Sequence, residues 1–241
     1  MAYCTGPLGA YAEANNVPAD RVVKLPAGIA DETAAASLLK GMTAQYLLKR
    51  TYPVRPGETI LFHAAAGGVG LIACQWAKHL GATVIGTVGS PEKVALASAN
   101  GCTHVVNTRE DSWSKRVREI TGGAGVPVVY DGIGKETFMG SLDCLAVRGT
   151  MVSFGNASGA VPPFEPGLLS SKGSLYLTRP TLFHYTRTAK ELQGTADDLC
   201  DVIQSGVVKI AIHQRFRLSE ARQAHEALHS RATTGATLLI P

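Results

Sequence analysis

The fold is decided by the stretch TILFHAAAGGVG, residues 59–70. Residues 59–64 form a mainly apolar run of strand length, and residues 68–80 carry apolar side chains at helical spacing. The turn between them, residues 65–70, matches the spacing G-x-G-x-x-G with alanine in the first place. Small residues let the backbone approach a pyrophosphate, and the first turn of a helix offers unpaired N–H groups. We therefore predict a strand, a phosphate-binding turn and a helix; the alternative is a turn whose glycines serve only tight packing.

Short apolar strands alternate with helices after this stretch. Strands are expected at residues 83–88, 104–107, 126–131, 150–154 and 174–178, with helices starting near Ser90 and spanning 113–121 and 135–144. This alternation is typical of a parallel sheet covered on both faces. The sequence predicts an α/β protein with a Rossmann doubly wound parallel sheet at about residues 41–181.

The flanking segments follow a different pattern. Two helices are expected before the first strand, one from Asp31 to about Lys40-Gly41 and one from Thr43 to just before Pro53. After Pro180 the expected elements are a helix over 188–205, a strand near Phe216, a helix over 219–230 and a strand over 237–240. The segments outside residues 41–181 belong to a second structural region.

Composition excludes several classes of protein. Among 241 residues, 45% are hydrophobic and 17% charged, which favours a folded core over disorder. The net charge of +4 is too small and dispersed for a nucleic-acid partner. The five cysteines are scattered, which argues against disulfides and structural zinc and favours a reducing, cytoplasmic location. Residues 59–77 carry no charge, but their central glycines argue against a membrane-spanning helix.

The end of the second strand indicates which dinucleotide is bound. NAD-binding folds usually place a carboxylate there, whereas residues 86–90 contain none. Its absence favours NADPH, because a carboxylate would repel the 2′-phosphate. Ser90 and Lys93 are candidates for holding this phosphate; the alternatives are a simple helix cap and a solvated lysine.

Two further parts of the predicted sheet contain residues that could contribute to a functional site. Phe154-Gly155-Asn156 lies at the carboxyl end of the sheet, where it would border a nicotinamide or form an ordinary turn. His63 lies within an apolar strand and is predicted to be a core histidine rather than a catalytic one.

Several segments together resemble the NADPH:quinone oxidoreductase (zeta-crystallin-like) family of the medium-chain dehydrogenase/reductase superfamily. They are AAASLLKGMTA at 34–44, FHAAAGGVGLIA at 62–73, MVSFGN at 151–156, and SRAT at 230–233 close to the final LLIP. The likeness runs over the whole chain. In the family, most of a GroES-like substrate domain precedes the segment that begins here at Met1. The resemblance therefore implies a remnant of that domain at 1–40, a Rossmann NADP-binding domain at 41–181 and a C-terminal return to the substrate domain at 182–241.

The resemblance also implies a set of NADPH contacts. Thr43 and Tyr46 would lie at the nicotinamide-ribose end, Gly67, Gly68 and Val69 under the pyrophosphate, and Ser90 and Lys93 at the 2′-phosphate. Phe154, Gly155 and Asn156 would border the nicotinamide, with Thr181 and Arg231 closing over the cofactor. Thr108 stands where the family has a tyrosine beside the adenosine phosphate; it is too small to stack, although the charge of Arg109 would compensate.

The implied activity is NADPH-dependent reduction of quinones or related conjugated carbonyls by a homodimer. Edge pairing of residues 174–178 with their copy would form the dimer; the alternative is a capped edge strand in a monomer. No Gly-His-Glu motif or cysteine cluster is present, so the enzyme is expected to be independent of zinc. No catalytic side chain is identified. One alternative is an enoyl or alkenal reductase on the same scaffold. Another is a non-catalytic NADPH-binding module, because the substrate domain is incomplete.

Overall fold

The computed structural model describes residues 9–110, 112–230 and 233–241. The chain forms two compact units, each assembled from segments that are separated in the sequence. The first unit contains the residues up to Tyr46, residues 67–72 and the residues from Leu182 onward; the second contains residues 47–66 and 73–181.

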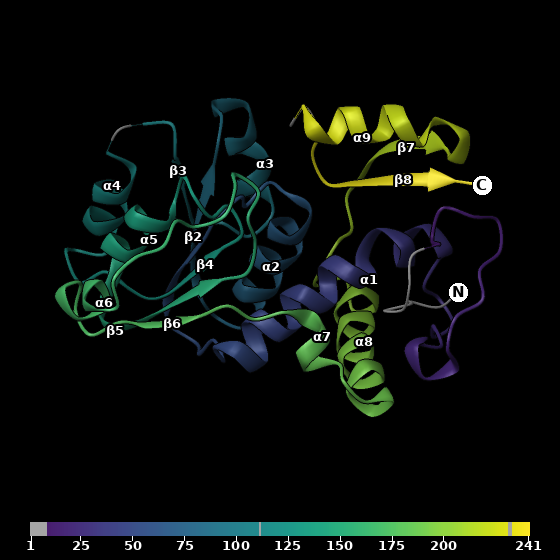
Figure 1. Cartoon of the computed structure of the whole chain (residues 1–241), viewed down its shortest axis with the longest axis horizontal. Helices are drawn as coiled ribbons and strands as arrows, with labels where there is room; N and C mark the ends of the chain where they lie inside the picture. Colours follow the sequence, from purple (N-terminus) through teal and green to yellow (C-terminus); the bar gives the residue numbers. More distant parts are fainter. Residues whose placement is uncertain (1–8, 111, 231–232) are drawn as a thin grey trace. The chain divides into compact units, whose positions relative to one another are not determined.

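The second unit is built on a parallel sheet of six strands. These are β1 (Thr59–Phe62), β2 (Thr83–Val88), β3 (His104–Asn107), β4 (Val126–Asp131), β5 (Leu145–Ser153) and β6 (Tyr176–Thr178). Their spatial order is β3-β2-β1-β4-β5-β6, and every neighbouring pair is parallel (Figure 1). This order is that of the dinucleotide-binding doubly wound fold, so the predicted fold class is confirmed.

Helices connect these strands. They are α2 (Gly68–His79), α3 (Val94–Ala99) with a preceding 3₁₀ turn η3 (Pro91–Lys93), α4 (Trp113–Ile120), α5 (Phe138–Cys144) and α6 (Gly167–Ser171). The helices α4 and α5 pack on each other, and side chains from α5 join the inner strands in one buried cluster. Continuous burial along β1, β2 and β4 explains why these strands are apolar runs rather than alternating ones.

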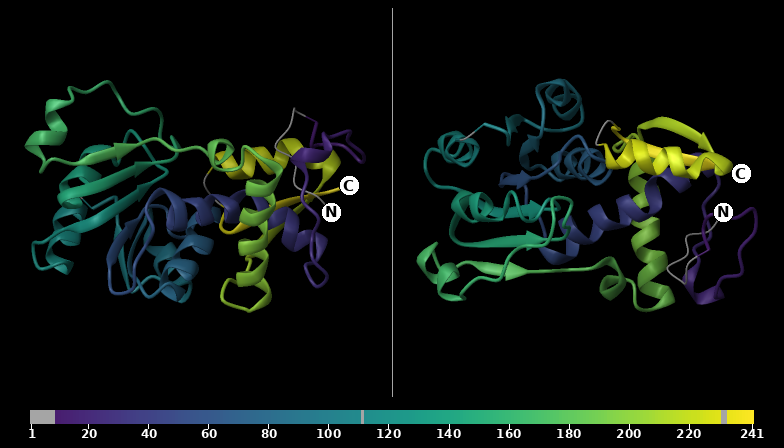
Figure 2. Two further views of the ribbon diagram at one scale, coloured as in Figure 1. Left: turned by 90° about the horizontal axis from the view of Figure 1, so that it is seen from below. Right: turned by 45° about the horizontal axis from the view of Figure 1, so that its top comes forward.

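The first unit combines helices with a small sheet. Its elements are η1 (Ala19–Arg21), α1 (Asp31–Tyr46), α7 (Leu182–Tyr185), α8 (Ala189–Gln204), α9 (Ala221–His229) and the parallel pair β7 (Ile212–Arg217) and β8 (Ala236–Ile240). The long helix α1 packs against α8 and β8, as the views in Figure 2 show. A capping box starts α8: Thr188 Oγ1 accepts from Glu191 N at 3.1 Å, while the Glu191 carboxylate accepts from Thr188 N.

The predicted helix break at Lys40-Gly41 is wrong. Gly41 lies inside α1, and the chain continues beyond Tyr46 through a π-helical turn, η2 (Leu47–Thr51). A Cβ at Gly41 would lie 2.4 Å from Leu199 Cδ1, so this glycine admits a side chain of α8 rather than ending the helix. Tertiary packing has outweighed the low helix propensity of glycine.

The boundaries of other elements also differ from expectation. Strand β5 begins at Leu145 instead of Thr150, and α5 begins at Phe138 instead of Lys135. The short helices α6 (Gly167–Ser171) and α7 (Leu182–Tyr185) were not predicted from the sequence. Within the described residues no helix is both long and apolar enough to span a membrane.

Candidate functional site

The carboxyl ends of the six parallel strands share one edge of the sheet. The strand order reverses between β1 and β4, because the successive crossovers from these two neighbours lead away in opposite directions. Open α/β sheets bind ligands outside the carboxyl edge at this switch point. The loops after β2, β3, β4 and β5 all open at this edge, and each of them except the loop after β4 carries a site residue predicted from the sequence.

The turn after β1 lies close to β2. Ala64 adopts a positive φ of 52°, and Ala65 N donates to Thr87 O at 2.8 Å. A Cβ at Gly86 would lie 2.7 Å from Ala65 Cβ and 2.3 Å from Cys102 Sγ, so β2 needs glycine at this position. This tight approach fixes where the chain turns toward α2.

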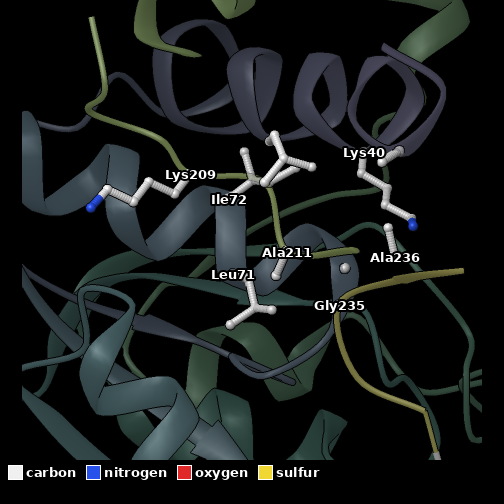
Figure 3. Close-up of a pocket in the computed structure, with 10 residues that line it drawn as sticks. Lys40, Leu71, Ile72, Lys209, Ala211, Gly235 and Ala236 are labelled. Atoms are coloured by element: carbon white, nitrogen blue, oxygen red, sulfur yellow. The ribbon is translucent and has the colours of Figure 1, made fainter. Parts of the chain in front are cut away.

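Gly67, Gly68 and Val69 lie at the start of α2 and belong to the first unit. A Cβ at Gly68 would lie 2.8 Å from Lys40 Cδ and 3.2 Å from Gly235 O. Figure 3 shows Lys40 extending toward Ala236 beside a cavity of about 10 Å³, which has room for about one water molecule. Burial lowers the pKa of the Lys40 ammonium group. Gly68 therefore meets a packing requirement of the first unit, whatever it contributes to ligand binding.

Ser90, Lys93 and Thr108 lie together at the ends of β2 and β3. Thr108 donates to Val88 O from its backbone N at 2.9 Å and from Oγ1 at 3.2 Å, which holds it against the end of β2. Ser90 precedes η3, and Lys93 ends it. The structure thus brings together three of the residues predicted for the adenosine-phosphate end.

Glu92 lies in the same cluster and was missed by the sequence analysis. A hydrogen bond from the Ser90 hydroxyl is the largest cause of its lowered pKa, followed by its own backbone N–H and the charges of Arg109 and Lys93. Residues 86–90 contain no carboxylate, but Glu92 lies two positions further on, and the turn of η3 brings it back to the Ser90 side chain. The Glu92 carboxylate therefore interacts electrostatically with both Arg109 and Lys93 at this edge of the sheet.

Phe154, Gly155 and Asn156 follow β5 and are held by the loop after β4. Phe154 N donates to Asp131 O at 2.8 Å, and its ring centroid lies 5.8 Å from that of Phe62. A Cβ at Gly155 would lie 2.5 Å from Gly132 O, so only glycine permits this approach of the two loops. The Asn156 side chain is exposed.

The remaining predicted residues lie elsewhere. Thr181 is half-buried in the second unit, three residues after β6. Thr43 and Tyr46 belong to α1 of the first unit: Thr43 Oγ1 donates to Leu39 O within the helix, and the buried Tyr46 ring stacks on Tyr185 at 4.6 Å. Arg231 lies outside the described residues.

His63 is a buried core residue, as predicted, but it belongs to a polar chain that the sequence did not reveal. Its Nδ1 lies 2.8 Å from Thr87 Oγ1 and its Nε2 lies 2.9 Å from Ser141 Oγ. Ser141 in turn donates to the fully buried Asp131 carboxylate at 2.9 Å. Burial lowers the pKa of the imidazole, and the Asp131 charge opposes this shift only in part.

The described residues contain no group of three or more His, Cys, Asp or Glu side chains that could hold a metal ion. Cys74, Cys102, Cys144 and Cys200 are free and buried. Burial is the main cause that raises the pKa of the Cys144 thiol to about 12, so this thiol is not a ready nucleophile or metal ligand.

Comparison with known proteins gives a consistent result. The family model described as "Zinc-binding dehydrogenase" matches residues 68–201. The chain is 55% identical over 241 residues to a quinone oxidoreductase of Pseudomonas aeruginosa, covering 100% of this chain and 74% of that protein. It is 45% identical over 241 residues to a 2-haloacrylate reductase of a Burkholderia species, covering 99% and 72%. The crystal structure of Escherichia coli quinone oxidoreductase complexed with NADPH matches with a TM-score of 0.97 and 53% identity, covering 99% and 74%.

The buried His63 makes stability depend on pH. The unfolded imidazole takes up a proton near its ordinary pKa of 6.5, whereas the folded one takes it up only at lower pH. The unfolded state therefore binds more protons just below pH 6.5, and stability falls as the pH decreases. Between pH 7.5 and 5.5 we expect His63 to account for a loss of up to about 1.4 kcal/mol.

Urea unfolding of the wild type and of His63→Gln at these two pH values measures the effect. The variant should be less stable at pH 7.5 but lose less stability on acidification. His104→Gln, which alters an exposed imidazole, is the control and should keep the wild-type slope. An unchanged slope in His63→Gln would contradict the assignment.

Proposed function

Because the chain belongs to the quinone oxidoreductase family of the medium-chain dehydrogenase/reductase superfamily, we propose that it is an NADPH-dependent reductase of quinones or related conjugated carbonyls. The observation that carries the proposal is its 53% identity, over 99% of its length, to an oxidoreductase solved with NADPH. The sheet order and the carboxyl-edge loops described above support the same conclusion. The activity is expected to be cytoplasmic.

The residues at the carboxyl edge fit NADPH. Ser90 and Lys93 would bind the 2′-phosphate through a hydroxyl donor and a positive charge, with Thr108 beside them. Gly67, Gly68 and Val69 would offer backbone N–H groups at the start of α2 to the pyrophosphate. Phe154, Gly155 and Asn156, which follow β5, would border the nicotinamide.

The protein's part in the reaction is to bind and orient. NADPH supplies the reducing equivalents when bound. The glycine at position 155 lets the backbone approach the ring, and Phe154, packed on Phe62, gives that segment a fixed apolar side. No side chain is assigned as a general acid, since the oxygens of a reduced quinone can take protons from water. The proposed reaction has no step that uses a zinc ion, in line with the lack of a Gly-His-Glu motif and a cysteine cluster in the sequence.

The two flanking segments, residues 1–40 and 182–241, are proposed to belong to a GroES-like substrate domain. Residues 41–181 form the proposed NADP-binding domain. The described parts of both flanking segments fall in the first unit, which fits a role distinct from that of the sheet.

A second candidate is an enoyl or alkenal reductase. The 45% identity to a 2-haloacrylate reductase favours it, because that name denotes reduction of a conjugated carbon–carbon double bond. A third candidate is a module that binds NADPH without catalysis. Each predicts a different outcome when acceptors are added to the bound cofactor.

The function is tested by following NADPH absorbance after addition of 1,4-benzoquinone or of a 2-haloacrylate. We expect rapid quinone-dependent oxidation of NADPH and slower oxidation with NADH. Oxidation by the haloacrylate alone would favour the second candidate. Tight binding with no oxidation by either acceptor would support the non-catalytic module and overturn the reductase.

The phosphate assignment predicts opposite effects for two neighbouring side chains. Lys93→Glu replaces a cation at the 2′-phosphate by an anion and should weaken NADPH binding by roughly ten- to a hundredfold. Glu92→Gln removes the carboxylate that shares the cluster and should tighten NADPH binding by about two- to fivefold, an effect reduced by salt.

Fluorescence titration with NADPH and NADH at low and high salt measures both effects. NADH lacks the 2′-phosphate, so its dissociation constant should change little in either variant. Equal effects on NADPH and NADH would show that this cluster does not hold the phosphate.

We also propose a homodimer formed by pairing of two β6 edges. Strand β6 ends the sheet, and Tyr176 and Leu177 are 62% and 36% exposed on it. Pairing with a second copy would extend the sheet and satisfy its free backbone groups. Sedimentation at micromolar concentration should give twice the chain mass of 25.3 kDa. Leu177→Lys should favour monomer, whereas Met139→Lys on α5 should not; a wild-type monomer would overturn the proposal.

A further inference from the structure

A continuous hydrogen-bonded chain crosses the second unit just inside the carboxyl edge of the sheet. It runs from Thr87 on β2 through His63, which follows β1, to Ser141 on α5 and the carboxylate of Asp131 at the end of β4. Thr87, His63, Ser141 and Asp131 are all at most 1% exposed. These hydrogen bonds therefore link three neighbouring strands and one helix, and the side chains that form them are shielded from solvent.

The partners of each side chain determine which atom donates and which accepts in every hydrogen bond of this series. The Asp131 carboxylate only accepts, so Ser141 donates its single hydroxyl proton to Oδ2. The Ser141 oxygen must then accept from His63 Nε2–H. Burial keeps the imidazole neutral, which leaves Nδ1 as an acceptor for the Thr87 hydroxyl. One arrangement of protons satisfies all four side chains.

Asp131 has further donors besides Ser141. Its Oδ2 also accepts from Thr137 Oγ1 at 2.8 Å, and its Oδ1 accepts from the backbone N–H groups of Ile133 at 2.7 Å and Gly134 at 3.0 Å. In the part of the chain that the structure describes, this buried charge is balanced by hydroxyl and amide donors rather than by a cation. Such an arrangement is stable only while each donor keeps its place.

The hydrogen bonds from the Ile133 and Gly134 N–H groups to Asp131 fix the conformation of the loop after β4. That loop is in turn hydrogen-bonded to the segment after β5. Ala157 N donates to Gly132 O at 3.2 Å, Ser158 N to Ile133 O at 2.8 Å, and Lys135 N to Gly159 O at 3.1 Å. Phe154 N donates to the carbonyl oxygen of Asp131 itself. The position of residues 154–159 therefore depends on how the carboxylate orders residues 132–135.

We propose that Asp131 is a positioning residue for the nicotinamide half of the cofactor site, with Ser141 and His63 holding its carboxylate in place. This inference rests on the proposed function, because it takes Phe154–Asn156 as the segment that borders the nicotinamide. The residues proposed for the adenosine phosphate, Ser90 and Lys93, follow β2, whereas the loop that the Asp131 carboxylate orders follows β4, on the other side of β1. We therefore expect Asp131 to act on the nicotinamide half of the dinucleotide.

Binding of two ligands to Asp131→Asn tests the proposal. NADPH spans both halves of the site, whereas 2′,5′-ADP occupies only the adenosine-phosphate half. The amide adds donors where the carboxylate only accepts, so we expect the dissociation constant of NADPH to rise about tenfold and that of 2′,5′-ADP to change less than about twofold. Glu136→Gln removes an exposed carboxylate in the same loop and is the matched control, expected to leave both constants unchanged.

Ser141→Ala provides a second, milder variant that keeps the Asp131 carboxylate and its other donors. It should weaken NADPH binding by about two- to fivefold and leave 2′,5′-ADP binding unaffected. If thermal melting without ligand shows that Asp131→Asn does not fold, Ser141→Ala tests the proposal in its place.

Equal weakening of both ligands, or no change in NADPH binding, would overturn the proposal, because a residue that only stabilises the domain does not distinguish them. Failure of the wild type to bind either ligand would instead overturn the proposed function and this inference with it. A loss confined to NADPH in a folded variant supports both.

Discussion

Strand β1 is hydrogen-bonded to β2 on one side and to β4 on the other, and both pairings are parallel. Parallel pairing requires a crossover after each strand, and the crossovers from these two neighbours run in opposite directions along the sheet. The carboxyl ends of all six strands consequently face one edge, and the strand order reverses between β1 and β4. The positions of the proposed phosphate and nicotinamide segments follow from this arrangement.

Close backbone approach then gives the edge its detailed shape. Gly86 lets the turn after β1 lie on β2, and Gly155 lets the loops after β4 and β5 touch. The Asp131 carboxylate fixes the orientation of one of those loops by accepting hydrogen bonds from two of its backbone N–H groups. The edge is therefore fixed by buried contacts within the second unit before any ligand binds, which lowers the entropic cost of binding.

The fold could be predicted from the sequence because its signals are local. Apolar runs of strand length, separated by helices at helical spacing, identify the sheet, and the turn at residues 65–70 identifies its first crossover. The break expected at Gly41 failed because the contact that explains this glycine comes from Leu199, which is distant in the sequence. Patterns within a short stretch of sequence do not identify a contact with a residue so far along the chain.

The candidate site was predictable only in part for the same reason. Ser90 and Phe154 follow strands directly, so the strand pattern places them at the edge. Glu92 reaches the Ser90 hydroxyl only through the turn of η3, and the bond from His63 to Ser141 joins residues 78 positions apart. A histidine in an apolar run predicts burial but does not identify its partners.

The proposed cofactor site is tested most directly by a crystal structure of this chain grown with NADPH. We predict the 2′-phosphate between Ser90 and Lys93 and the nicotinamide beside Phe154 and Gly155, at the carboxyl edge of the sheet. Cofactor bound away from this edge, or bound there with the nicotinamide at the end of β2, would contradict it.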